Sequence, residues 1–250
     1  MARTGAIAMM VAYHVAYDVD FLAPGVPIDP FGGGWRALQV ATGSSFLAIV
    51  GVSLSISNAR ARSRGARGLA LWRRHARRGA QVLAAALAVS LATWIALGDE
   101  YVRFGILHCI GVSMLLAPAF VRLGALNLAL GAAAIGAGLA VRDAALGGPD
   151  VLALLLGFAP GGEAGVDRYP LLPWFGAVLV GLAVGTLLYP GGERGPWARR
   201  LPAAAPAALS RAGAPGRHAL PVYLVHQPVL IPLVAVLLLA AGADVELDGP

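Results

Sequence analysis

Two ionisable residues interrupt an apolar run near the start of the chain, between Ala8 and Asp18. His14 and Asp18 stand four residues apart, so on a helix their side chains share one face. Ionisable groups at membrane depth are costly, and they usually face a protein interior or a water-filled cavity. We therefore expect this helix to form one wall of a polar chamber.

Two more histidines lie within apolar segments. These are His108 and His226, the second followed directly by Gln227. Histidine suits proton transfer near neutral pH or nucleophilic attack, and a nearby carboxylate can orient its ring. The pattern predicts that His14, oriented by Asp18, is a general base or acyl carrier. His108 and His226 are its expected co-workers.

Simpler roles for these residues stay open at this point. A membrane histidine can serve only as a hydrogen-bond partner between helices, and Asp18 can serve only to cap the external mouth. Three histidines and a water hold zinc in some proteins, but the spacing of these three is not diagnostic, and we expect no metal. His75 and His218 lie in or beside arginine-rich segments and are expected on solvated faces.

The composition places the chain in a membrane. Of its 250 residues, 58% are hydrophobic and 13% are charged, whereas soluble domains carry about 25% charged residues. The apolar runs have helical length, which argues against the short alternating strands of a membrane β-barrel. The single cysteine, Cys109, excludes an internal disulfide or a cysteine metal cluster.

Seven apolar segments are expected to span the membrane, where a span needs roughly 20 residues, and the first of them is short. We expect an all-α polytopic bundle that forms one integral-membrane domain over residues 1–250. The expected helices cover residues 7–21, 35–56, 79–97, 104–121, 123–141, 171–189 and 220–241.

The charges fix an expected topology. All 19 basic residues are arginines, and most fall between residues 58 and 78 or between residues 194 and 217. The positive-inside rule then places these segments and the N-terminus in the cytoplasm, and the C-terminus outside. The same distribution explains the net charge without nucleic acid. In this topology the three membrane histidines converge in the external half of the bilayer.

Two groups of residues are candidates for binding. The arginines Arg73, Arg74, Arg77 and Arg78 serve topology and can also bind phosphates of a cytosolic nucleotide-like cofactor. Asp167, Tyr169 and Trp174 belong to the expected external mouth, where Trp174 either sits in the interfacial belt or stacks on a sugar. The chain has no nucleophile elbow, Walker loop or dinucleotide fingerprint.

Six strings along the chain carry a family resemblance. They are Met10–Asp18, Phe46–Ser53, Arg73–Gly79, Phe104–Gly111, Tyr169–Gly176 and Tyr223–Leu230. In this order they resemble the motifs of bacterial members of the heparan-alpha-glucosaminide N-acetyltransferase catalytic-domain family. The resemblance covers nearly the whole chain, and the series is more specific than any one string.

The resemblance implies transfer of an acetyl group from cytosolic acetyl-CoA to an amino sugar across the membrane. It implies that the arginine group meets the CoA phosphates and that the histidines act as general base or carry the acetyl group. Sugar would enter from outside past Asp18, Asp167 and Trp174, with Tyr169 and Gln227 as further substrate contacts.

The chain departs from the family pattern at its start. The family has an acidic residue before Arg-Gly, whereas this chain has Arg3-Thr4, so we expect the native start to lie upstream. The lysosomal enzyme differs from the bacterial group around His14 and His108, so its glycosaminoglycan substrate is not expected here. A cell-envelope glycan at the bacterial inner membrane is the expected acceptor.

Other function classes fit the same residues. The first alternative is a proton-coupled transporter or exporter whose histidines relay protons. The second is a non-catalytic membrane subunit. The sequence leaves open whether the chain forms a homo-oligomer.

Overall fold

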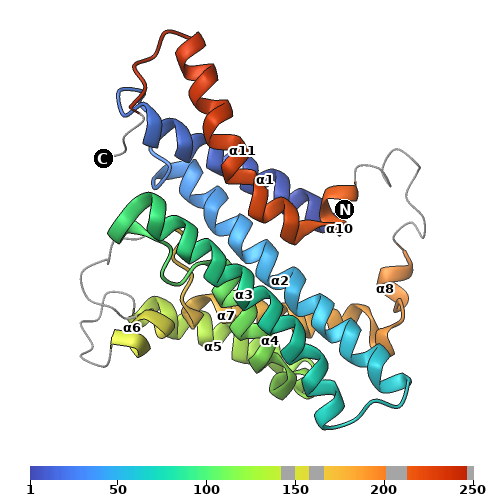
Figure 1. Ribbon diagram of the computed structural model, residues 1–250. Coiled ribbons are helices and arrows are strands. Elements are labelled where there is room, and N and C mark those ends of the chain that lie inside the picture. The colour runs from blue at the N-terminus through green and yellow to red at the C-terminus, as the bar shows by residue number, and fades with distance from the viewer. Residues whose placement is uncertain (142–149, 158–165, 201–212, 247–250) are drawn as a thin grey trace. The chain divides into compact units, whose positions relative to one another are not determined.

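The computed structural model describes residues 1–141, 150–157, 166–200 and 213–246, and within these residues it is all-helical (Figure 1). Each of the seven expected segments is a helix. The long helices are α1 (Ala2–Leu22), α2 (Gly33–Ser63), α3 (Leu69–Leu97), α4 (Ile106–Phe120), α5 (Leu126–Val141), α7 (Leu171–Leu188) and α11 (Ala219–Ala240). The short elements are the α-helices α6 (Asp150–Leu156), α8 (Pro196–Arg199) and α10 (Ala214–Arg217) and the 3-10 helices η1 (Gly98–Glu100), η2 (Val121–Leu123) and η3 (Pro190–Gly192).

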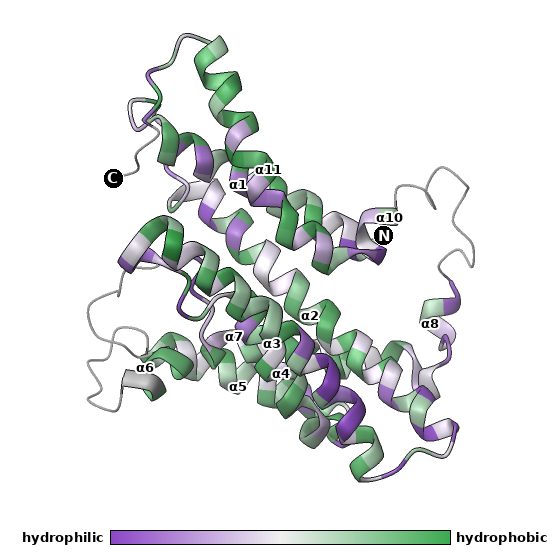
Figure 2. Cartoon of the chain, viewed as in Figure 1, coloured by the Kyte–Doolittle hydropathy of each residue, from purple (hydrophilic) through white to green (hydrophobic). Residues whose placement is uncertain are grey.

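Within the residues that the structure describes, five helices are long and apolar enough to cross a membrane: α2, α3 with η1, α4 with η2, α7 and α11. Helix α5 is apolar but has only 16 residues. Hydrophobic residues run along most of these helices, while hydrophilic ones gather on the first half of α3 (Figure 2). The chain is therefore an integral membrane helix bundle. Seven spans and a cytoplasmic N-terminus stay predictions.

The arginine-rich segment at residues 58–78 is mostly helix rather than the loop that the sequence predicts. Helix α2 continues to Ser63, and α3 begins at Leu69. Arginine and alanine are good helix formers, so both helices extend beyond their apolar portions. Within the second arginine-rich segment, Arg211 lies outside the described residues.

The chain divides into two compact units. Unit 1 comprises Met1–Phe46 and Ala204–Pro250, and unit 2 comprises Leu47–Ala203. The expectation of a single domain stays a prediction.

In unit 1, α1 packs along α11 and α10, which joins the two ends of the sequence. An apolar cluster at one end of this pair contains Leu22, Leu230, Val234 and Ala235. The Glu246 backbone N–H donates to the Leu22 carbonyl at 2.8 Å, which ties the C-terminal segment to the end of α1.

In unit 2, helices approach each other closely at paired glycines. A Cβ on Gly131 of α5 would lie 2.9 Å from the Gly176 carbonyl oxygen of α7, and a Cβ on Gly176 would lie 2.7 Å from the Gly131 carbonyl oxygen. Gly79 of α3 and Gly111 of α4 form a second such pair. Small residues let membrane helices approach backbone to backbone where the hydrophobic effect cannot hold them together.

We expect Gly131→Ala to destabilise the protein and Gly136→Ala, in the same helix, to leave it unchanged or slightly more stable. A Cβ at Gly131 meets backbone atoms that cannot move aside, whereas a Cβ at Gly136 meets nothing within 4 Å. Alanine is better than glycine in a helix by up to about 1 kcal/mol, so only packing separates the two variants. Thermal unfolding in detergent measures the difference, and equal midpoints would contradict the packing argument.

Candidate functional site

Helices α1 and α11 bring two pairs of polar side chains together inside unit 1. The ring centroids of His14 and His226 are 4.7 Å apart with the rings edge to face. One turn along α1, the Gln227 Nε2 donates to the Asp18 Oδ1 at 3.0 Å. Four of the sequence-predicted site residues therefore lie at one place, between helices that begin and end the chain.

The hydrogen bonds of the two histidines assign their ring protons. The Nδ1 of His14 is 2.8 Å from the Met10 carbonyl oxygen, and the Nδ1 of His226 bonds to the Tyr223 carbonyl oxygen. Because a carbonyl only accepts, each Nδ1 carries the proton and each Nε2 has the lone pair. Both Nε2 atoms thus have the form required of a general base or nucleophile.

The orienting partner of His14 is a backbone carbonyl of its own helix, one turn earlier. Asp18 was expected in that position, but its carboxylate accepts a hydrogen bond from Gln227 instead. Every residue type has a backbone carbonyl, so the sequence could not reveal that Met10 is the partner of His14.

Asp18 is one of the most enclosed polar residues described, with 1% of its surface exposed. Its second oxygen, Oδ2, is buried without a hydrogen-bond partner, and so is the Gln227 Oε1. Both atoms are hydrogen-bond acceptors when the carboxyl is ionised. The pair is internally bonded but incompletely satisfied.

Two prolines remove backbone hydrogen bonds from α11 beside this pair. Pro228 and Pro232 lie inside the helix and lack the N–H that would bond to the carbonyl four residues earlier. In membrane helices such interruptions occur where protein or a water-filled cavity surrounds the freed carbonyl.

His108 lies in unit 2 and has a different hydrogen-bond pattern. Its Nδ1 accepts from the Gly105 N–H at 3.2 Å, so the neutral ring carries its proton on Nε2. That Nε2 is 3.4 Å from the Ser90 Oγ, which donates to the Val102 carbonyl at 2.6 Å. His108 thus fastens the start of α4 to α3. Its convergence with His14 and His226 stays a prediction.

The expected mouth residues of unit 2 gather around the start of α4. The Asp167 Oδ2 accepts from the Ile106 N–H at 3.1 Å, and the Tyr169 N–H donates to the Phe104 carbonyl at 3.0 Å. The rings of Tyr169 and Trp174 are 4.5 Å apart. The three predicted residues therefore do lie together in unit 2.

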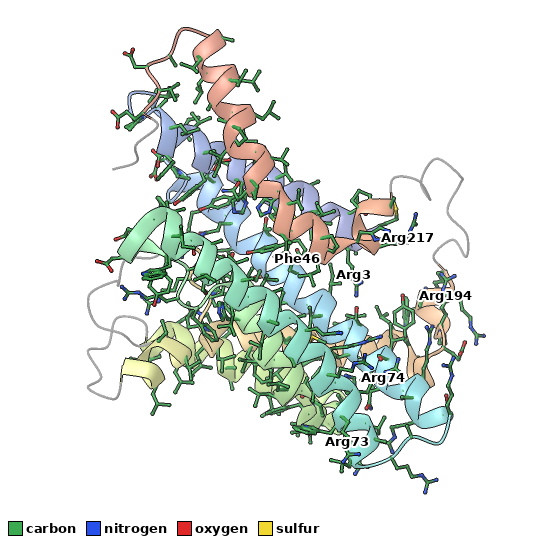
Figure 3. All side chains as sticks on the ribbon, viewed as in Figure 1. Arg3, Phe46, Arg73, Arg74, Arg194 and Arg217 are labelled. Atoms are coloured by element: carbon green, nitrogen blue, oxygen red, sulfur yellow. The ribbon has the colours of Figure 1, made fainter. Side chains whose placement is uncertain are left out.

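The arginine group occupies the first half of α3, where all four side chains are exposed. Figure 3 labels Arg73 and Arg74 on this part of the helix. His75, expected on a solvated face, is instead buried with 1% of its surface exposed, and neither ring nitrogen has a hydrogen-bond partner. It continues the buried stripe of α3 that includes Leu71 and Gly79.

Several helices that are long and apolar enough to span a membrane define a polytopic integral membrane protein. Residues 1–228 match the family described as heparan-alpha-glucosaminide N-acetyltransferase, catalytic. The chain belongs to this family, which makes it a membrane acetyltransferase-type protein and confirms the resemblance seen in its sequence. No curated protein and no solved structure matches the chain.

The link through Ser90 gives a stability prediction for unit 2. Ser90→Ala leaves the Val102 carbonyl and the His108 Nε2–H without this partner, and an unmade buried hydrogen bond costs about 1–3 kcal/mol. We expect a lower midpoint of thermal unfolding. Ser57→Ala is the matched control, because the Ser57 Oγ is buried without a partner and its removal costs little. Equal midpoints for the two variants would contradict the assigned role of Ser90.

Proposed function

We propose that the chain moves an acetyl or similar acyl group from cytosolic acyl-CoA to an amino sugar or cell-envelope glycan outside the bacterial inner membrane. Family membership favours group transfer over the proton-coupled transporter. The observation that carries the chemistry is that the Nδ1 of both His14 and His226 donates to a backbone carbonyl in part-buried surroundings, which leaves the Nε2 lone pair on each ring.

The reaction assigns one task to that lone pair. In direct transfer, the acceptor nitrogen or oxygen attacks the thioester carbonyl while the Nε2 of His14 takes its proton. The new bond to the acyl carbon forms, the carbon–sulfur bond breaks, and the CoA thiolate leaves and is protonated. If Nε2 attacks first, the acyl group rests on the histidine before the acceptor receives it. Both routes need the same tautomer.

The arginines of α3 are the proposed contacts of the acyl donor. Arg73 and Arg77 stand four residues apart and share one helix face, as Arg74 and Arg78 do. Arginine binds phosphate oxygens through paired N–H groups. A CoA molecule carries phosphates remote from its thioester, so this group would bind the nucleotide end of the donor.

We expect His14→Ala to lower kcat for acyl transfer by about 10²–10⁴-fold, the usual contribution of a general acid or base. His218→Ala is the control, since His218 is exposed in the same unit. The assay follows release of CoA thiol from acetyl-CoA by purified protein in lipid nanodiscs. Full activity in His14→Ala would remove this residue from the mechanism.

The donor site has its own test. We expect the double variant Arg73→Ala/Arg77→Ala to raise the KM for acetyl-CoA by tenfold or more, because each lost charge-assisted hydrogen bond is worth about 1.5–3 kcal/mol. The KM for S-acetylpantetheine, which has no phosphates, should not change. Arg36→Ala, outside the arginine group, is the control. Equal effects on both donors would show that the arginines do not bind phosphate.

A further inference from the structure

His75 is a buried polar side chain of unit 2 whose hydrogen bonds are unmade. It has 1% of its surface exposed, and neither Nδ1 nor Nε2 has a hydrogen-bond partner. A neutral imidazole carries one N–H donor and one lone pair, so a donor and an acceptor are both left over. Unsatisfied buried groups lower stability, whereas an apolar side chain of similar shape would not. The fold therefore gains nothing from the polar atoms of this ring.

The ring lies where the buried stripe of α3 meets the arginine group. Residues three or four apart on a helix are neighbours, with Cβ atoms about 5–6 Å apart. His75 stands three residues before Arg78, which is exposed, and four before Gly79, which is buried. Arg74, labelled in Figure 3, directly precedes it, and the charges of Arg74 and Arg78 both act on the ring. A phosphate that bridges these two arginines would lie over the turn that contains His75.

The neighbouring helix supplies no charge of the opposite sign. Helix α4 packs along α3, and Gly79, one turn beyond His75, approaches Leu115 of α4. Residues 111–120 contain no titratable side chain, and Arg122, just after them, is exposed. The acidic residues of η1 belong to the opposite end of α3. A proton on His75 is therefore opposed by the arginines unless an anion binds beside them.

We propose that His75 is a proton-linked residue of the donor site, which takes a proton from solvent and donates an N–H to a CoA phosphate when acetyl-CoA binds. This inference rests on the proposed function, because the phosphates are those that the arginine group would hold. The imidazolium has two N–H donors and no acceptor, which suits a phosphate oxygen. The bound ring gains a charge-assisted hydrogen bond that no group around it supplies in the free protein.

Binding linked to proton uptake has a defined dependence on pH. The complex holds more protons than the free protein, so the affinity for acetyl-CoA rises as the pH falls through the range in which His75 titrates. One linked proton changes the Kd by up to about tenfold per pH unit. Arginine stays charged throughout this range, so histidine is the residue that makes the donor site sensitive to pH. A phosphate monoester titrates near pH 6 as well, and comparison of variants cancels its contribution.

The test measures acetyl-CoA binding by isothermal titration calorimetry, with the full-length protein in lipid nanodiscs near neutral pH. Proton uptake is the slope of the binding enthalpy against the ionisation enthalpy of the buffer. We expect the wild type to take up more protons than His75→Phe, a variant that fills the same space without polar atoms. The Kd of this variant should be higher by about tenfold or more, the value of one charge-assisted hydrogen bond.

Thermal unfolding separates this role from a structural one. Without ligand, the midpoint of His75→Phe should equal or exceed that of the wild type, because two unsatisfied polar atoms are removed. His75→Gln keeps an N–H donor but does not titrate, so it should recover part of the affinity and none of the proton uptake. His218→Phe is the matched control, since this exposed histidine also directly follows an arginine.

The inference and the proposed function fail in different ways. Equal proton uptake and equal Kd in the wild type and His75→Phe would overturn the role of His75 and leave the arginine group as the donor site. Failure of the wild type to bind acetyl-CoA would overturn the donor site itself. S-acetylpantetheine, which has no phosphates, should bind to the wild type and to His75→Phe alike. Weaker binding of both donors to the variant would show that the ring acts through packing, which contradicts the inference.

Discussion

The polar cluster of unit 1 depends on one requirement, that a carboxylate placed in an apolar helix pair must meet a donor. Asp18 meets Gln227, a residue 209 positions later in the chain. Helices in lipid gain little from hydrophobic contact, so hydrogen bonds and close packing hold them together. The Asp18–Gln227 hydrogen bond therefore also has a structural role, because it fixes the register of α1 against α11 where the histidines meet. Any change in that register would separate the two rings.

In unit 2, some buried polar groups also have hydrogen-bond partners, but the helices are held together differently. Its helices contact each other through glycines, and its polar side chains are used to close the ends of helices. Asp167 receives the first free N–H of α4, and His108 receives the N–H of Gly105 just before it. Helix starts have N–H groups without intrahelical partners, and in a membrane protein those groups need side chains more than in water. Asp167 and His108 therefore both stabilise the start of α4.

The helices could be predicted because their lengths follow from the bilayer thickness and the apolar runs. Their limits were less predictable at α2 and α3, where arginine-rich sequence was assigned to a loop although its residues favour helix. The burial of His75 follows from the same extension: once α3 begins at Leu69, the residues Leu71, His75 and Gly79 repeat every four positions on one face. The pairing of Asp18 with Gln227 could not be predicted, since nothing local specifies a partner so distant in the sequence.

The three membrane histidines look alike in the sequence but differ in what their ring nitrogens can do. In His14 and His226 the backbone of the same helix accepts the Nδ1 proton, which leaves Nε2 basic. In His108 a backbone N–H occupies Nδ1 and the proton moves to Nε2, where Ser90 lies. The difference arises from position within the helix: carbonyls one turn back are available in the middle of α1 and α11, whereas His108 sits in the first turn of α4, where free N–H groups surround it. Location along a helix, more than residue type, therefore separates a base from a cap.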